Sequence, residues 1–151
     1  MNVYLRDIDQ ENFNECINLS LSEEQKSYVS SNVHSIAESK IFPFWIPKAI
    51  YENDKMVGFL MYAIDCGEEK LDISRLMIDG KYQGMGYGKK ALEIMENIAR
   101  DNHGINRIVI HVEKENSRAK YIYEKYGFED MKRVEYGQEV FILKIRRITT
   151  E

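Results

Sequence analysis

The run Gln83-Gly84-Met85-Gly86-Tyr87-Gly88 places glycine at three alternate positions. Glycines leave the backbone uncovered, so amide N–H groups can converge on the oxygens of a ligand. A helix that begins at this turn would add its free N–H groups and a partial positive charge, and Lys89 and Lys90 follow directly. The pattern suits a pyrophosphate. Its spacing is neither that of a P-loop nor that of G-x-G-x-x-G, and such turns also arise for purely geometric reasons.

The sequence patterns on both sides of this turn predict the elements that position it. Residues 71–78 alternate and then become continuously apolar, which predicts a strand that enters a core. From Ala91 to Ala99 apolar residues recur at helical spacing, and Gly104 is a natural end for that helix. The sequence therefore predicts a strand, a glycine turn and a helix.

A second segment, residues 116–128, reads Asn-Ser-Arg-Ala-Lys-Tyr-Ile-Tyr-Glu-Lys-Tyr-Gly-Phe. Asn116 is a plausible N-cap of a helix, and Gly127 is a plausible end. This segment resembles N-x-x-A-x-x-[aliphatic]-Y-x-K-x-G-F, a signature of the GCN5-related N-acetyltransferase (GNAT) superfamily. Gln83, Gly86 and Gly88 match the acetyl-CoA motif of the same family, Gln/Arg-x-x-Gly-x-Gly/Ala. The resemblance covers the chain from Val3 to about residue 145.

The resemblance implies an α/β fold: a single mixed, mostly antiparallel sheet with splayed central parallel strands, flanked by helices. The implied parallel strands are residues 71–78 and 107–113, with the cofactor acetyl-CoA between them. The backbone of Leu76, Met77 and Ile78 would hold the pantetheine, and the Met77 N–H would polarise the thioester carbonyl. The remaining implied cofactor-binding residues are Gln83, Gly84, Met85, Gly86, Tyr87, Gly88, Lys89, Asn116 and Tyr123.

Tyr123 falls on the tyrosine that family members use as general acid toward the CoA sulfur. A phenol suits that task because its ordinary pKa near 10 keeps it protonated at neutral pH. The alternative is a packing role on an apolar helical stripe. The base stays open, because the family uses a carboxylate, a water chain or no dedicated residue; the strand carboxylates are Glu52, Asp72 and Glu113.

The N-terminal half resembles bacterial spermine/spermidine acetyltransferases through residues 22–29 and 47–62. Such enzymes use acidic and aromatic side chains to bind long cations. Glu23 and Glu24 have an alternative role in a first helical turn, where they complement the dipole. The candidate acceptor-binding residues are Glu23, Glu24, Tyr28, Glu38, Trp45, Glu52 and Asp72.

Length and composition bound the remaining possibilities. With 151 residues and 44% hydrophobic content, residues 1–151 are expected to form a single N-acetyltransferase domain. A net charge of −4 argues against nucleic acid or an anionic membrane as partner. The chain has neither a secretory pattern nor an apolar run of membrane-spanning length, so a cytoplasmic protein is expected. Two cysteines and three histidines show no ligand spacing, so no metal is expected.

The other expected elements complete an α/β order. A strand is expected at residues 3–6, followed by a helix that is capped by Asp9 and has Phe13 in its apolar face. One further helix is expected to start at Ser22 and to carry Val33 on its inner face. Hairpins are expected at residues 49–63 and 131–145, the second around Gly137 and Gln138.

These patterns together predict an acetyl-CoA-dependent N-acetyltransferase. Transfer would be direct, in a ternary complex, to a primary amine, with a polyamine favoured over another small amine or a protein N-terminus. An acetyl-CoA-binding sensor without turnover is the alternative from another class. A homodimer through the apolar last strand, residues 141–143, is allowed.

Overall fold

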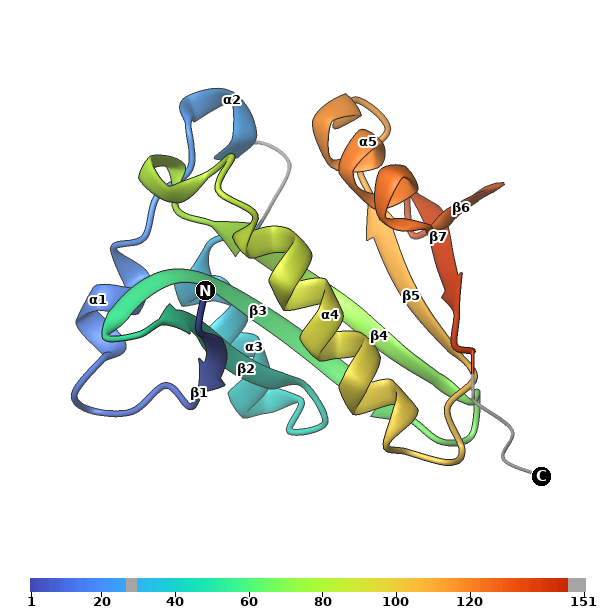
Figure 1. Cartoon of the computed structure of the whole chain (residues 1–151), viewed down its shortest axis with the longest axis horizontal. Helices are drawn as coiled ribbons and strands as arrows, with labels where there is room; N and C mark the ends of the chain where they lie inside the picture. The colour runs from blue at the N-terminus through green and yellow to red at the C-terminus, as the bar shows by residue number, and fades with distance from the viewer. Residues whose placement is uncertain (27–29, 147–151) are drawn as a thin grey trace. The chain divides into compact units, whose positions relative to one another are not determined.

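The chain contains both helices and strands in mixed order, as the sequence predicts for an α/β protein (Figure 1). The computed structural model describes residues 1–26 and 30–146. The strand order in its sheet is β1 (Val3–Arg6), β2 (Ile46–Glu52), β3 (Lys55–Asp65), β4 (Lys70–Ile78), β5 (Arg107–Val112), β7 (Gln138–Lys144) and β6 (Glu129–Glu135). The pairs β1–β2, β2–β3, β5–β7 and β6–β7 are antiparallel, and β4–β5 is parallel. The predicted fold class, a mixed and mostly antiparallel sheet with a central parallel pair, is confirmed.

The contacts divide the chain into two units. The first unit is Met1–Ala63 with Ser74–Ile94, and the second is Ile64–Ile73 with Met95–Glu151. Three elements run from one unit into the other: β3 (Lys55–Asp65), β4 (Lys70–Ile78) and α4 (Tyr87–Arg100). That the chain forms one domain stays a prediction.

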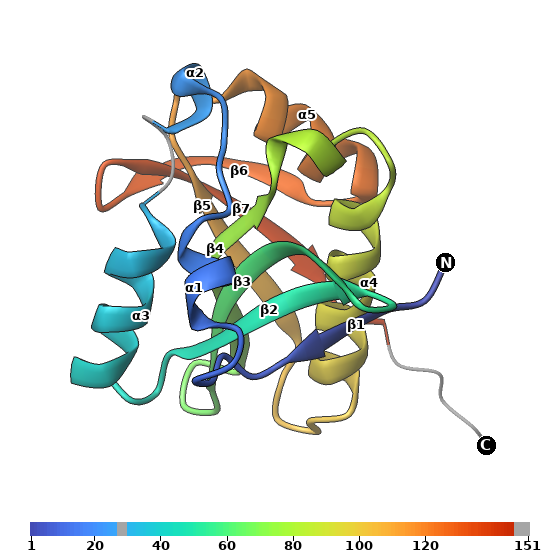
Figure 2. The ribbon, with the colours of Figure 1, turned by 90° about the vertical axis from the view of Figure 1, so that its left-hand side faces the viewer.

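The first unit holds the N-terminal elements and the glycine turn. Its elements are β1 (Val3–Arg6), α1 (Phe13–Ile17), α2 (Glu23–Lys26), α3 (Asn32–Ile41), β2 (Ile46–Glu52), β3 (Lys55–Asp65) as far as Ala63, the end of β4, the 3₁₀ turn η1 (Gly80–Tyr82) and the start of α4. Figure 2 shows α1 and α3 on the same side of β2 and β3. Their shared core contains Cys16 from α1, Phe59 and Met61 from β3, and Met77 from β4, with Ile36 of α3 packed against it.

The N-terminal helices differ from the prediction. Asn12, not Asp9, is the N-cap residue of α1, and Phe13 is exposed rather than buried. The single helix expected from Ser22 onward is two helices, because Ser31 starts α3 by accepting a hydrogen bond from the His34 N–H. The predicted cap at Ser22 does form, with Gln25 N–H donating to its hydroxyl at 3.3 Å.

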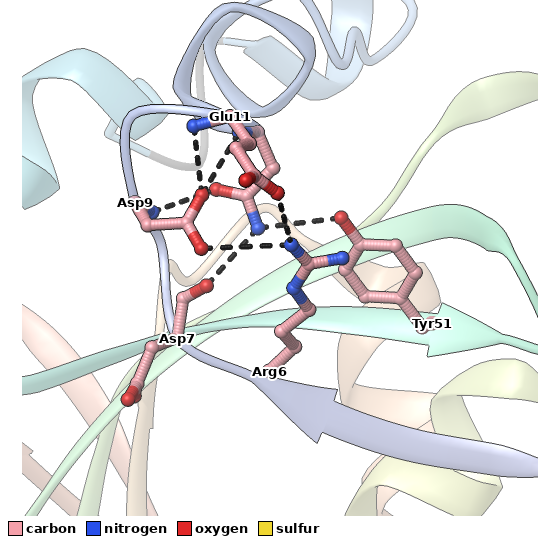
Figure 3. A network of polar contacts seen from close by, with 6 residues as sticks. Arg6, Asp7, Asp9, Glu11 and Tyr51 are labelled. Atoms are coloured by element: carbon pink, nitrogen blue, oxygen red, sulfur yellow. Dashed lines mark hydrogen bonds and ion pairs between the residues drawn. The ribbon is translucent and has the colours of Figure 1, made fainter.

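A polar network explains why α1 begins late (Figure 3). The Asp9 carboxylate accepts from the N–H groups of Glu11 and Asn12 at 2.9 and 3.1 Å, which forms a turn before the helix. The Arg6 guanidinium contacts Asp9 and Glu11 at 3.5 and 3.4 Å and lies over the Tyr51 ring. These contacts join β1, β2 and the segment that leads into α1.

The second unit contains the last two residues of β3, the start of β4, the end of α4, and β5 (Arg107–Val112), α5 (Ser117–Tyr126), β6 (Glu129–Glu135) and β7 (Gln138–Lys144). β4 pairs with β5 at four positions, from Lys70↔Arg107 to Ile73↔Ile110. The hairpin turn falls at Tyr136 and Gly137, which have φ of 53° and 78°. Positive φ at both central residues is typical of a tight hairpin turn, and it lies one residue earlier than predicted.

Candidate active site

The glycine turn has the uncovered backbone that the sequence predicts. Gly84 and Gly86 have φ of 79° and 91°, where side-chain-bearing residues are strained. A Cβ at Gly84 would meet nothing within 4 Å, and one at Gly86 would meet only the Met1 Cε at 4.0 Å. α4 begins at once, with Lys90 N–H donating to the Gly86 carbonyl at 3.1 Å. An open turn at the start of a fourteen-residue helix fits an anionic group such as the pyrophosphate of acetyl-CoA.

The Gln83 side chain fixes this turn. Its amide donates to the Ile78 carbonyl at 3.0 Å and to Gln25 Oε1 at 2.9 Å, and Gln25 donates back to Gln83 Oε1 at 3.2 Å. Gln83 therefore joins the turn to the end of β4 and to α2. The sequence motif points to Gln83, but nothing in the local pattern points to Gln25.

Tyr87, which follows the glycine Gly86 of the turn, contacts Glu52 at the end of β2. Tyr87, the first residue of α4, is buried, and a hydrogen bond to Glu52 raises its pKa above the ordinary value for tyrosine. The second oxygen of Glu52 is buried without a hydrogen-bond partner among the described residues. Glu52, an expected acceptor-binding residue, thus contacts the first residue of α4, and its acceptor role stays a prediction.

The last residues of β4 lie directly against β3. A Cβ at Gly58 of β3 would be 2.4 Å from the Met77 carbonyl oxygen and 2.9 Å from Ile78 Cδ1. Only glycine permits this approach. Gly58 therefore sets the position of the backbone that the family resemblance assigns to the pantetheine, at Leu76, Met77 and Ile78.

In the second unit, α5 carries the two remaining motif residues. Asn116 caps the helix, with its Oδ1 accepting from the Ala119 N–H at 3.2 Å. Tyr123 is 8% exposed and packs on Phe128, with ring centroids 5.7 Å apart. Burial raises the pKa of Tyr123, so the phenol keeps its proton at neutral pH, as a proton donor to a thiolate must.

Two of the acidic residues expected to bind the acceptor amine, Glu23 and Glu38, already lie next to positively charged or titratable side chains of the protein. Glu23 lies 2.9 Å from Lys26 one turn along α2. Glu38 lies 3.8 Å from His34 and 3.9 Å from Arg75. Trp45 is half-buried against the core of the first unit, and Tyr28 lies outside the described residues.

Asp72 lies in a charged cluster of the second unit that the sequence did not reveal. Burial raises the pKa of this carboxyl, while Lys70, 3.6 Å away, and His111 oppose the shift. His111 Nε2 lies 3.1 Å from Glu135 Oε2 on β6. Another strand carboxylate, Glu113, accepts from the Gln138 side chain at 3.1 Å.

In the part of the chain that the structure describes, no group of three His, Cys, Asp or Glu side chains could hold a metal ion. No helix there is long and apolar enough to cross a membrane.

The chain belongs to the acetyltransferase (GNAT) family, whose model matches residues 3–128. It is an acetyltransferase of that type, and acetyl-CoA is its cosubstrate, as the sequence predicts.

The chain is similar to a spermine/spermidine N(1)-acetyltransferase of Bacillus subtilis (strain 168), with 25% identity over 150 residues, 95% of this chain and 99% of the relative. Among solved structures, a spermidine N-acetyltransferase from Vibrio cholerae in complex with CoA and spermine has a TM-score of 0.74 at 16% identity, covering 95% of this chain and 96% of that one. The aminoglycoside acetyltransferase AAC(6')-Ib in complex with coenzyme A has a TM-score of 0.77 at 16% identity, covering 95% of both chains. The likeness to these two structures shows a common fold.

Proposed function

We propose that this protein transfers an acetyl group from acetyl-CoA to a primary amine, and that the amine is a polyamine of the spermine or spermidine kind. The observation that carries the proposal is the open glycine turn at the start of α4, in a chain that belongs to an acetyltransferase family. The polyamine acceptor is supported by the Bacillus subtilis relative, which spans nearly the whole chain.

The proposed cofactor contacts follow from the residues of each unit. The N–H groups of residues 84–88, with Lys89 beside them, bind the pyrophosphate. The backbone of Leu76, Met77 and Ile78 holds the pantetheine, and the Met77 N–H polarises the thioester carbonyl. Asn116 and Tyr123 complete the set, with Tyr123 protonating the departing CoA thiolate.

Chemistry by direct transfer needs no covalent enzyme intermediate. The neutral amine nitrogen attacks the thioester carbonyl carbon and gives up a proton to a base or to water. The C–S bond breaks, and the CoA sulfur receives the phenolic proton, which Tyr123 regains from solvent. We place this reaction in the cytoplasm, with a small-molecule amine as partner and neither nucleic acid nor membrane required.

The test is release of free CoA thiol from acetyl-CoA in the presence of spermine, spermidine, a monoamine of similar length and an aminoglycoside, with the acetylated product identified by mass. A polyamine should give the highest kcat/KM. Acetylation of the aminoglycoside alone would refute the polyamine acceptor, and binding of acetyl-CoA without turnover of any amine would indicate a sensor.

Glu23 and Glu24 of α2 provide a second test. Its control is a variant of the neighbouring Lys26, which is expected to shift the KM for spermine in the opposite direction. Replacing Glu23 and Glu24 together by Gln should raise the KM for spermine several-fold more than that for the monoamine, because the distal ammonium groups lose their counter-charges. Lys26→Gln removes the cation that lies 2.9 Å from Glu23, so it should lower the KM for spermine. Both shifts should shrink in high salt. Equal shifts for all amines would exclude this segment from acceptor recognition.

A further inference from the structure

Two lysine ammonium groups of the first unit lie at the same tyrosine ring, just before the glycine turn. Lys55, the first residue of β3, has its Nζ 5.4 Å from the centre of the Tyr82 ring. Lys81 of η1 has its Nζ 5.3 Å from the same centre. Both lysines are exposed, and the ring attracts each ammonium group through its negative face. Two like charges are therefore held close together at the surface of the first unit.

These two charges are not neutralised within the described part of the chain. Neither ammonium group forms an ion pair there, not even Lys55 with its exposed sequence neighbour Asp54. Glu52 is opposite Lys55 in the β2–β3 register, but its carboxylate accepts a hydrogen bond from Tyr87. Asp79 is buried and accepts two backbone N–H groups, at 3.0 and 3.1 Å. Because the two ammonium groups repel each other, an anion that binds between them is favoured.

The lysines border the turn that is proposed to bind the pyrophosphate. Tyr82 precedes Gly84 by two positions, so their Cα atoms are at most about 7.6 Å apart. The Asp79 N–H donates to the Val57 carbonyl at 2.9 Å, which holds the residue before η1 against β3, two positions after Lys55. An anion at the two lysines would therefore lie next to an anion at the turn.

Acetyl-CoA carries two such anions on one ribose ring. The pyrophosphate is attached at the 5′ position, and a phosphate monoester is attached at the 3′ position. Because both groups belong to the same ribose, their binding sites must be neighbours. A phosphate monoester has a charge of about −1.5 to −2 at pH 7, which two lysines can neutralise. Lysine suits this task because its ammonium group is a point charge with three donors.

We propose that Lys55 and Lys81 bind the 3′-phosphate of acetyl-CoA, and that the Tyr82 ring holds the two ammonium groups in place for it. The proposal deepens the proposed function, on which it rests, by assigning a second anion site for the cosubstrate. The two lysines act on cofactor affinity and on the choice of a 3′-phosphorylated cofactor. They take no part in the transfer step, so kcat does not depend on them.

The competing interpretation is a surface brace, in which Lys55 joins the start of β3 to η1 through the Tyr82 ring. A brace stabilises the fold equally whichever cofactor is bound. A phosphate site distinguishes acetyl-CoA from acetyl-dephospho-CoA, which keeps the pyrophosphate and lacks the 3′-phosphate. The affinities for these two compounds therefore separate the two roles.

The experiment is calorimetric titration of wild type, Lys55→Gln, Lys81→Gln and the double variant with both compounds, together with their urea midpoints. Wild type should bind acetyl-CoA about tenfold more tightly than acetyl-dephospho-CoA. Each single variant should lose about three- to fivefold in affinity for acetyl-CoA, and the double variant about tenfold, with less loss in high salt. Affinity for acetyl-dephospho-CoA should stay unchanged. Lys125→Gln is the matched control, because Lys125 is exposed and its Nζ lies 5.7 Å from the centre of the Tyr121 ring.

Equal losses for the two compounds in the double variant would overturn the proposal, because the lysines would then act on the pyrophosphate or through general charge. A lowered urea midpoint with unchanged affinities would identify a brace and also overturn it. The same would follow if wild type bound both compounds equally or if Lys125→Gln reproduced the loss. Since the readout is binding, absence of amine acetylation by wild type would contradict the proposed function alone, and the two affinities would still decide this proposal.

Discussion

Replacing Gly58 by alanine tests how tightly β3 positions the end of β4. The added methyl carbon would lie 2.4 Å from the Met77 carbonyl oxygen, whereas ordinary contact begins at 3.4 Å. The two strands must therefore separate by about 1 Å at this point, or the Met77 peptide must rotate. Overpacking of this kind costs about 1–3 kcal/mol, and the lower entropy of the unfolded alanine chain offsets about 0.4–1 kcal/mol of it.

The assay is urea unfolding followed by the fluorescence of Trp45, the chain's one tryptophan, which packs against the core of the first unit. Calorimetric titration with acetyl-CoA completes the test. Gly58→Ala should lower the unfolding midpoint and weaken acetyl-CoA binding, because the displaced carbonyl belongs to the proposed pantetheine strand. Gly104→Ala is the control, since its methyl group would meet nothing within 4 Å. Equal stability and equal affinity of the two variants would refute the reasoning.

Three further outcomes are expected. Gly86→Ala and Gly137→Ala both place a methyl group at positive φ without a steric clash, so each should lower the free energy of unfolding by about 1–2 kcal/mol. Only Gly86→Ala should weaken acetyl-CoA binding in titration, and equal affinities of the two variants would exclude the turn as the pyrophosphate site. Tyr123→Phe keeps the ring and deletes the proton, so kcat should fall roughly 10²-fold with little change in acetyl-CoA affinity, and a wild-type kcat would leave Tyr123 a packing residue. Burial raises the pKa of Cys16 to about 11, so at pH 8 a thiol reagent should label the exposed Cys66 quickly and Cys16 only after unfolding; rapid labelling of both native thiols would contradict the burial.

The segments that were predicted correctly carry their information locally. The turn at residues 83–88, the cap at Asn116 and the helix end at Gly127 each depend on one residue type at a fixed place in a short run. The helix expected from Ser22 onward was wrong because Ser31 offers a second cap, and local preference does not rank the two. The approach of Gly58 to Met77 and the pair His111–Glu135 depend on strand neighbours. The strand order β5-β7-β6 brings His111 and Glu135 together although they are twenty-four positions apart in the sequence, and hydrophobic periodicity cannot reveal such a pair.

The division into two units also limits which fragments and chimeras of this protein can be made. Each unit is assembled from two separate stretches of chain, and residues 64–73 belong with the C-terminal half although the N-terminal half surrounds them in sequence. A fragment that starts at residue 95 would retain β5, β6 and β7 but lack the β4 residues that pair with β5. Its β5 edge would then expose unpaired backbone groups and invite aggregation. The C-terminal half therefore cannot be exchanged between related enzymes as a contiguous cassette, and a functional chimera must carry residues 64–73 from the same parent.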